Sequence, residues 1–179
     1  MVDLKTFKNP LYNHGRSLVI RFLWMVVSRL FINTWIPYPS KFKTIVLKLF
    51  GAKIGGGFVI RPFVKIKHPW CIQIEDNVWI GESVWIDNLV LVTIGSNVCI
   101  SQGAFLFTGN HNYKSKSFDL ITDEIHLEMG VWIGAQAIVG PGVRCCSNSV
   151  LAAGSIAFKN LDSNCVYQGN PAEVKRMRN

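Results

Sequence analysis

The chain has 179 residues, of which 49% are hydrophobic and only 17% are charged. This length suits a single hydrophobic core, and the few charges together with many aromatic residues exclude intrinsic disorder. The formal net charge of +8 is unevenly divided, because residues 1–67 hold twelve basic residues against one acid, whereas the other 112 residues hold seven against ten. No nucleic-acid-binding motif accompanies the basic third, so we expect no nucleic-acid partner.

Residues 1–50 are predicted to form a basic, amphipathic helical extension. The stretch 17–32 is the most apolar, but Arg21 and Arg29 interrupt it, and it is shorter than the about 20 residues of a membrane-spanning helix. Its wide apolar side suits either an anionic membrane surface or packing on the protein's own core or a neighbouring subunit. A turn at 35–39 leads to a second short helix over 41–50, which Gly51 ends.

Residues 51–161 contain an internal repeat. A spacing of six positions places one inward residue on each short straight segment, and three segments complete a coil that stacks on the next one about 4.8 Å away. The sequence therefore predicts a parallel β-helix, which places this part of the chain in the all-β class. Glycines follow several repeat residues, and we expect them at corners whose dihedrals disfavour a Cβ. The repeat residues are Ile54, Ile60, Ile66, Ile72, Ile74, Ile80, Ile86, Val92, Ile94, Ile100, Leu106, Leu127, Ile133, Val139, Cys145 and Leu151.

Two segments depart from the repeat. Residues 107–125 are polar and are predicted to protrude from a corner as a loop, and such excursions are usually functional. The tail, residues 162–179, is predicted to end in a short basic helix. The five cysteines have no zinc-ligand spacing and make a poor disulfide framework, so we expect free thiols, no metal and a reducing compartment. No signal peptide is visible, which favours the cytoplasm.

The hexads, the segment TGNHNY, the run MGVWIGAQAIVGPGV, AAGSIAFKN and the closing GNPA resemble the hexapeptide-repeat acyltransferases. The pattern FGAKIGGGFVIRPFVKIKHPW, followed by WIGESVWIDNLVLVTIGSNVCISQG, is similar to the colanic acid biosynthesis acetyltransferase group of that family. The resemblance covers essentially the whole chain. It implies a left-handed β-helix, assembly as a homotrimer and acetyl-CoA as the co-substrate.

Acetyl transfer from a thioester to a hydroxyl requires a base for the hydroxyl proton and donors for the oxyanion. Histidine suits this role near neutral pH, and His111 is the one histidine in the protruding segment. The resemblance also places the catalytic base of the family at His111. We expect His126 to be a surface residue, because it alternates with apolar neighbours, and His14 and His68 are weaker candidates. These histidines lack the coil-related separations of a zinc site.

Two residues are candidates for binding the acceptor. Asp87 matches a position where sugar acetyltransferases of this family hold an acceptor-binding Asn. An Asp there can accept hydrogen bonds from sugar hydroxyls or orient His111, or it can be a solvated corner residue. Asn110, next to His111, is the second candidate.

The resemblance also suggests where acetyl-CoA binds. Ala135 and Ala153 match small residues over which the family lays the pantetheine arm, and one backbone amide there is expected to stabilise the oxyanion. Lys159 and Arg176 match basic positions near the nucleotide phosphates. Glu173 stands where some relatives carry a second Arg.

We therefore predict a cytoplasmic, trimeric O-acetyltransferase that acetylates a sugar hydroxyl of a colanic-acid-like exopolysaccharide precursor, which can be lipid-linked. The helical extension would contact the inner face of the membrane. Two alternatives stay open: an antibiotic or small-metabolite acetyltransferase of the same fold, and a non-catalytic, membrane-associated trimeric scaffold.

Overall fold

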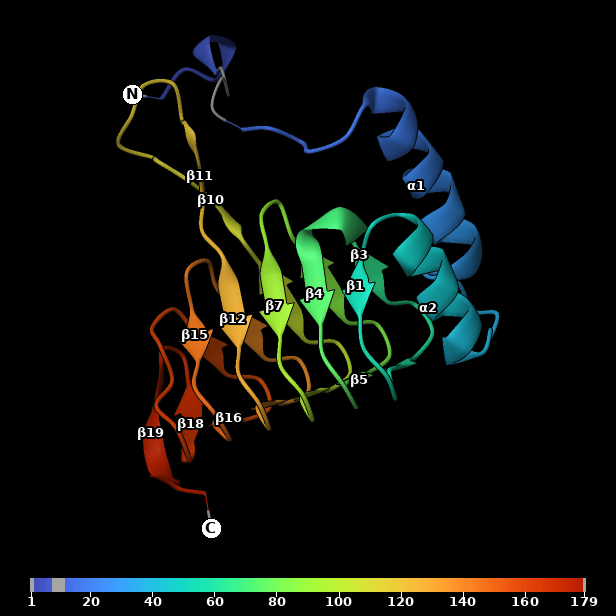
Figure 1. Cartoon of the computed structure of the whole chain (residues 1–179). Coiled ribbons are helices and arrows are strands. Elements are labelled where there is room, and N and C mark those ends of the chain that lie inside the picture. Colours follow the sequence, from blue (N-terminus) through green and yellow to red (C-terminus); the bar gives the residue numbers. More distant parts are fainter. Residues whose placement is uncertain (1, 8–11, 179) are drawn as a thin grey trace.

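The computed structural model describes residues 2–7 and 12–178; Met1, residues 8–11 and Asn179, which belong to the predicted extension and tail, lie outside the described residues. The core is a parallel β-helix with two helices at its N-terminal end (Figure 1). Three sheets, here called walls A, B and C, run along the β-helix, and each coil passes through them in that order. The predicted β-helix is confirmed.

The walls are built from short strands. Wall A contains β1 (Lys53–Ile54), β4 (Ile72–Ile74), β7 (Val92–Ile94), β12 (Ile125–Leu127) and β15 (Arg144–Cys145). Wall B contains β2 (Val59–Ile60), β5 (Trp79–Ile80), β8 (Cys99–Ile100), β13 (Trp132–Ile133), β16 (Val150–Leu151), β18 (Cys165–Gly169) and β19 (Ala172–Met177). Wall C contains β3 (Lys65–Ile66), β6 (Trp85–Asp87), β9 (Phe105–Phe107), β14 (Ile138–Val139) and β17 (Ile156–Ala157).

The repeat residues fill the interior of the β-helix, because every one of them is at most 8% exposed. The spacing of six is interrupted by steps of two positions, from Ile72 to Ile74 and from Val92 to Ile94, and these steps have a structural explanation. Both Ile72 and Ile74 point inward from β4, so wall A holds two inward residues in this coil, and Ile74 pairs with Ile94, twenty positions later. The coils before the insertion are therefore longer than the coil that follows it, where Leu127 pairs with Cys145.

The reason expected for the glycines is wrong at Gly81 and Gly134, neither of which has a positive φ. A Cβ on Gly134 would lie 2.5 Å from the backbone nitrogen of Ala153, and one on Gly81 would lie 2.6 Å from that of Gln102. The backbone of the next coil, not an unusual dihedral, excludes a side chain here. The left-handed corners are occupied by other glycines, such as Gly103 and Gly154, and by asparagines with φ of 59°, 60° and 59°: Asn77, Asn97 and Asn148.

Two helices cover the N-terminal end of the β-helix. Helix α1 (Leu18–Phe31) begins at Ser17, whose hydroxyl accepts a hydrogen bond from the Ile20 amide, and α2 (Ser40–Leu49) is followed by Gly51 at φ +100°. Helix α2 packs on β1 and β2 through Val46 and Leu47. A three-residue helix, η1 (Leu4–Thr6), precedes them.

Helix α1 lies outside α2, and its buried contact with the β-helix is made by Trp24. Trp24 is the buried residue among those described in α1, and its indole nitrogen donates to the Ile66 carbonyl over 3.0 Å. Its ring also packs on Phe50 at 5.1 Å. The rest of the helix is held by partly buried side chains such as Val27.

The predicted protruding loop contains a β-hairpin. Strands β10 (Gly109–His111) and β11 (Leu120–Thr122) pair antiparallel and leave the β-helix at the corner between walls C and A (Figure 1). Phe107 and Ile125, which the sequence placed in the loop, belong to β9 and β12.

The predicted C-terminal helix is wrong. Strand β18 pairs parallel with β16 at the edge of wall B, and β19 folds back antiparallel on β18 after the turn at Asn170 and Pro171. Cys165 and Tyr167 alternate inward from β18, and the Tyr167 hydroxyl donates to Asp162 Oδ2 over 3.0 Å. The backbone groups at the open edge of wall B form hydrogen bonds with the tail, whereas a short helix of the tail would be only marginally stable by itself.

Candidate active site

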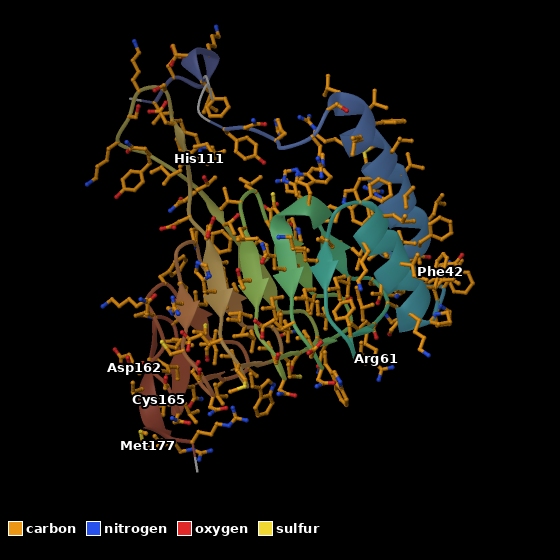
Figure 2. The ribbon with its side chains drawn as sticks, in the orientation of Figure 1. Phe42, Arg61, His111, Asp162, Cys165 and Met177 are labelled. Carbon is orange, nitrogen blue, oxygen red and sulfur yellow. The ribbon has the colours of Figure 1, made fainter. Side chains whose placement is uncertain are left out.

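His111 lies at the end of β10, on the hairpin that protrudes from the β-helix (Figure 2). Its Nδ1 is 2.9 Å from the Phe118 carbonyl oxygen, and its ring stacks on the Phe118 ring with centroids 4.3 Å apart and an interplanar angle of 6°. A carbonyl oxygen can only accept, so Nδ1 carries the proton. The neutral imidazole then has its lone pair on Nε2, which is the tautomer that a general base needs.

Phe118 holds the imidazole at a conformational cost. Its φ of 51° is in the left-handed region, which disfavours a bulky side chain. The turn around it is fixed by hydrogen bonds: the Phe118 amide donates to the Ser115 carbonyl, and the Ser117 hydroxyl donates to Asp119 Oδ1 over 2.7 Å. The hydrogen bond from Ser117, followed by that from Ser115, keeps the pKa of Asp119 below its ordinary value.

Asp87 ends β6 on wall C, directly under the corner from which the hairpin leaves. Its Oδ1 is 2.7 Å from Nζ of Lys67, which lies one coil earlier on the same wall. The Asp87 carbonyl accepts a hydrogen bond from the Thr108 amide at the base of the hairpin. In the described contacts, Asp87 pairs with Lys67 and not with His111. Within one chain, the imidazole of His111 is oriented by its hydrogen bond from Nδ1 to the Phe118 carbonyl.

Asn110 adjoins His111 on β10, and its side chain is exposed. The Asn110 Oδ1 accepts a hydrogen bond from the His111 amide over 2.8 Å. The side chain of Asn110 therefore braces the backbone at His111.

Two residues that precede α1 contact the hairpin with His111 and the region around His68. The Phe7 ring lies 5.9 Å from that of His111, and the Tyr12 hydroxyl lies 3.4 Å from His68 Nδ1. His68 stacks on Trp70 with centroids 4.8 Å apart. Burial lowers the pKa of His68 to about 4 and raises that of Tyr12 to about 12, so both side chains are neutral near pH 7.

A groove of about 580 Å³ lies over wall B, between the turns after its strands and the β18–β19 hairpin. It brings together three of the predicted donor-site residues, Ala135, Ala153 and Arg176, whereas Lys159 is exposed beyond β17 and does not line it. Within the described part of the chain, the amides of Ala135 and Ala153 donate to no other residue's backbone. The groove thus offers backbone donors and a cation. It is lined by Ser101, Gln102, Trp132, Gly134, Ala135, Val150, Leu151, Ala152, Ala153, Val166, Arg176 and Arg178.

Side-chain hydrogen bonds hold several residues that line the groove in place. The Trp132 indole nitrogen donates to the Ser101 hydroxyl over 2.9 Å. Arg178 donates from Nη1 to the carbonyls of Gly130, at 2.8 Å, and Asn148, at 3.1 Å, which fixes the end of β19 against the coils.

Sequence reasoning missed several of these residues. Lys67 was missed, although it lies twenty positions before the predicted Asp87. Twenty positions is the coil length of this region, so a search for partners of Asp87 at that separation would have found Lys67. Arg178 was missed because the tail was expected to be helical. Nothing in the sequence shows the left-handed φ of Phe118.

His111 and the groove do not meet within one chain. The hairpin leaves the corner between walls C and A, whereas the groove lies over wall B. In Figure 2, His111 lies near the top of the view, whereas Met177 of β19, next to the groove residue Arg176, lies near the bottom. Among residues 2–7 and 12–178, no cluster of His, Cys, Asp and Glu side chains could hold a metal ion.

No protein-family model matches the sequence. The chain is, however, 37% identical over 180 residues to an *Escherichia coli* K12 protein whose name assigns it to colanic acid biosynthesis as the acetyltransferase WcaF, and the match covers 99% of this chain and 98% of that protein. A hexapeptide-repeat acetyltransferase from *Vibrio cholerae*, solved with acetyl coenzyme A, has the same fold, with a TM-score of 0.83, 21% identity and coverage of 98% and 97% of the two chains. The chain belongs to the hexapeptide-repeat acetyltransferases.

The predicted family is therefore confirmed, and the chain is an acetyltransferase by this membership. The galactoside O-acetyltransferase of *E. coli* K12 is 32% identical over 145 residues, which cover 78% of this chain and 71% of that one. In this hexapeptide-repeat acetyltransferase, the protruding hairpin with His111 and the groove over wall B are the two candidate regions for acetyl transfer.

Proposed function

We propose that this acetyltransferase moves an acetyl group from acetyl-CoA to a saccharide hydroxyl, with His111 as the general base. The observation that carries the proposal is the hydrogen bond from His111 Nδ1 to the Phe118 carbonyl, which leaves the Nε2 lone pair for a substrate proton. Relatives named as a galactoside O-acetyltransferase and as a colanic acid biosynthesis acetyltransferase support a sugar hydroxyl as the acceptor.

The reaction uses few groups of the protein. Nε2 of His111 accepts the hydroxyl proton while the hydroxyl oxygen attacks the thioester carbonyl. The amide of Ala135 or Ala153 donates to the negative charge that develops on the carbonyl oxygen. When the carbon–sulfur bond breaks, the imidazolium returns the proton to the departing thiolate. Charge and protons balance, and no covalent acyl-protein forms.

The groove over wall B is the proposed donor site. Its open backbone amides suit the amides and thioester of the pantetheine arm, and Arg176 offers a cation to the nucleotide phosphates. The *Vibrio cholerae* protein of the same fold was solved with acetyl coenzyme A, which supports this donor. We keep Lys159 as a phosphate contact that a neighbouring subunit would bring into place.

A homotrimer would complete the site, because His111 of one chain and the groove of the same chain lie apart. Wall C offers an apolar outer surface for assembly: Trp85 stacks on Phe105 at 4.7 Å, Phe105 on Phe107 at 5.0 Å, and Phe107 meets Phe158 at 6.2 Å. Phe158 is 57% exposed in the single chain, which favours burial against a second copy.

The acceptor would bind between His111 and Asp87. The Asp87 carboxylate can accept hydrogen bonds from sugar hydroxyls, Lys67 holds it in place, and the Asn110 amide can donate. We propose a colanic-acid-like exopolysaccharide precursor as the acceptor and the cytoplasm, which supplies acetyl-CoA, as the compartment.

Replacement of the base tests the proposal directly. The His111→Ala variant should lose about 10²–10⁴-fold in kcat while binding acetyl-CoA with unchanged affinity in calorimetry. The matched control is His126→Ala, since His126 is an outward residue of β12 near Glu124 and belongs neither to the hairpin strands β10 and β11 nor to the lining of the groove. An unchanged kcat in His111→Ala would refute the assignment.

Subunit complementation tests the shared site. The His111→Ala and Ala153→Trp variants should each be inactive, the second because the large side chain fills the groove. Random mixed trimers should recover about a quarter of the wild-type sites, where an intact hairpin faces an intact groove. No recovery in mixed trimers of confirmed composition would show that the site lies within one chain.

An acceptor screen separates the saccharide from other acceptors of the same fold. Acetyl-CoA consumption is measured with nucleotide sugars, lipid-linked oligosaccharides, free sugars and hydroxylated antibiotics. Turnover with an antibiotic alone would favour the small-metabolite alternative, and failure to bind acetyl-CoA would favour the non-catalytic scaffold.

A further inference from the structure

Helix α1 is apolar on the side that faces away from the β-helix. We call this side the outer surface of α1; it consists of Leu18, Val19, Phe22, Leu23, Val26 and Leu30. The side chains of Leu18, Val19 and Phe22 are 73%, 67% and 61% exposed. A helix that is apolar both toward the protein and away from it needs a second partner besides the core of the protein.

The neighbouring residues enlarge this surface. Trp35 in the connection and Leu49 of α2 are 74% and 79% exposed, and Ile45 of α2 is exposed beside Leu49. The rings of Phe31 and Phe42, 5.5 Å apart, join the two helices at this edge. Figure 2 shows Phe42 and the side chains of α1 projecting outward from the helical end of the molecule. Large contiguous apolar patches of this kind mark interaction sites.

The charge around this surface has one sign. Residues 1–67 contain Asp3 as their one acid, against twelve basic residues. Arg29 lies within the outer surface of α1, Arg16 precedes the helix, and Lys41 and Lys48 lie on α2; all four are exposed. Long basic side chains can bury their stems in an apolar phase while the charged ends stay at its boundary.

We propose that the outer surface of α1 docks on an anionic lipid bilayer, with α1 lying in the plane of the headgroups. Helix α1 has 14 residues, a length of about 21 Å, which is too short to cross a bilayer of about 30 Å. In the described ranges no helix is long and apolar enough to span a membrane. Apolar residues with a basic rim are the composition of helices that lie in the membrane interface.

Charge complementarity decides between lipid and a second copy of the chain. A second copy that docked through the same surface would bring Arg29 and Lys48 toward identical cations, with no acid of residues 4–67 to compensate them. Anionic headgroups instead attract each of these side chains. The apolar outer surface of wall C, which suits contact between copies, is formed by aromatic rings of β6, β9 and the residue after β17, and includes no residue of α1.

Vesicle flotation with the full-length protein tests the proposal. The protein should float with vesicles that contain phosphatidylglycerol and not with pure phosphatidylcholine, and salt at about 0.5 M should weaken the binding. The Val19→Ser, Phe22→Ser double variant should lose at least about tenfold in affinity. The matched control, Val174→Ser, replaces an exposed valine of β19 and should bind like the wild type.

Two results would overturn the proposal. One is equal flotation of the double variant and the wild type. The other is a lower mass of the double variant in light scattering without vesicles, which would assign the outer surface of α1 to contact between copies. Binding of acetyl-CoA is measured in parallel and should be unchanged in the double variant, so failure of the docking proposal is distinguishable from failure of the proposed acetyl transfer.

Discussion

Acid should destabilise the fold through His68. The side chain is 6% exposed, its ring stacks on Trp70, and its Nδ1 faces the Tyr12 hydroxyl. Burial, and after it the charge of Lys67, lowers the pKa of His68 to about 4. The folded state therefore holds this imidazole in its neutral form, whereas in the unfolded chain it would titrate at about 6.5.

The sign and size of the effect follow from these two pKa values. Above about pH 6.5 neither state binds the proton, so stability is unaffected. As the pH falls toward about 4, the unfolded chain takes up a proton that the folded chain refuses, and the free energy of unfolding decreases. Between about pH 7.5 and pH 5 the loss amounts to about 2 kcal/mol from His68.

Urea denaturation at both pH values measures this loss. The His68→Phe variant keeps an aromatic ring against Trp70 but cannot titrate at this position. Between the two pH values its free energy of unfolding should therefore decrease by about 2 kcal/mol less than that of the wild type. Because other groups titrate equally in both proteins, the difference between them isolates His68. The control His126→Phe should keep the wild-type slope. Identical slopes for wild type and His68→Phe would refute the reasoning.

Two further predictions concern the groove. Gly134→Ala would place a Cβ 2.5 Å from the Ala153 nitrogen and should lower the free energy of unfolding by about 1–3 kcal/mol and weaken acetyl-CoA binding, whereas Gly56→Ala, with its nearest neighbour 3.6 Å away, should change neither. Arg176→Ala should weaken acetyl-CoA binding about 5- to 10-fold in calorimetry, and Lys175→Ala, outside the groove, should not. Equal effects of Gly134→Ala and Gly56→Ala would contradict the role of Gly134, and equal effects of Arg176→Ala and Lys175→Ala would contradict the role of Arg176.

The β-helix could be predicted from the sequence because its periodicity is directly visible. Each inward position recurs at a fixed separation, and Ile80, Ile100 and Ile133 are buried where the spacing places them. The role of the glycines could not be predicted, since a Cβ at Gly134 conflicts with a coil that becomes a neighbour only after folding. The same applies to the tail: the residues of β19 favour no strand by themselves, and the open edge of wall B decides their structure.

The candidate site was predictable in part. His111 stands out as the histidine in a polar interruption of the repeat, and small residues at 135 and 153 follow the coil spacing. The tautomer of His111 depends on one carbonyl of a turn in the left-handed region, at Phe118, which no local pattern encodes. The position of Arg178 depends on contacts with Gly130 and Asn148, far from it in the sequence.

The hairpin that carries His111 enters the β-helix without disturbing it. Ile94 pairs with Leu127 in the same register in which Ile74 pairs with Ile94, although the hairpin separates the first pair in sequence. The coils on either side thus pair with each other as if the hairpin, residues 109–122, were absent. The hairpin can therefore diverge in length and composition while the solenoid stays intact. Under the proposed function, natural variation or engineering of this module would alter the acceptor independently of the donor groove.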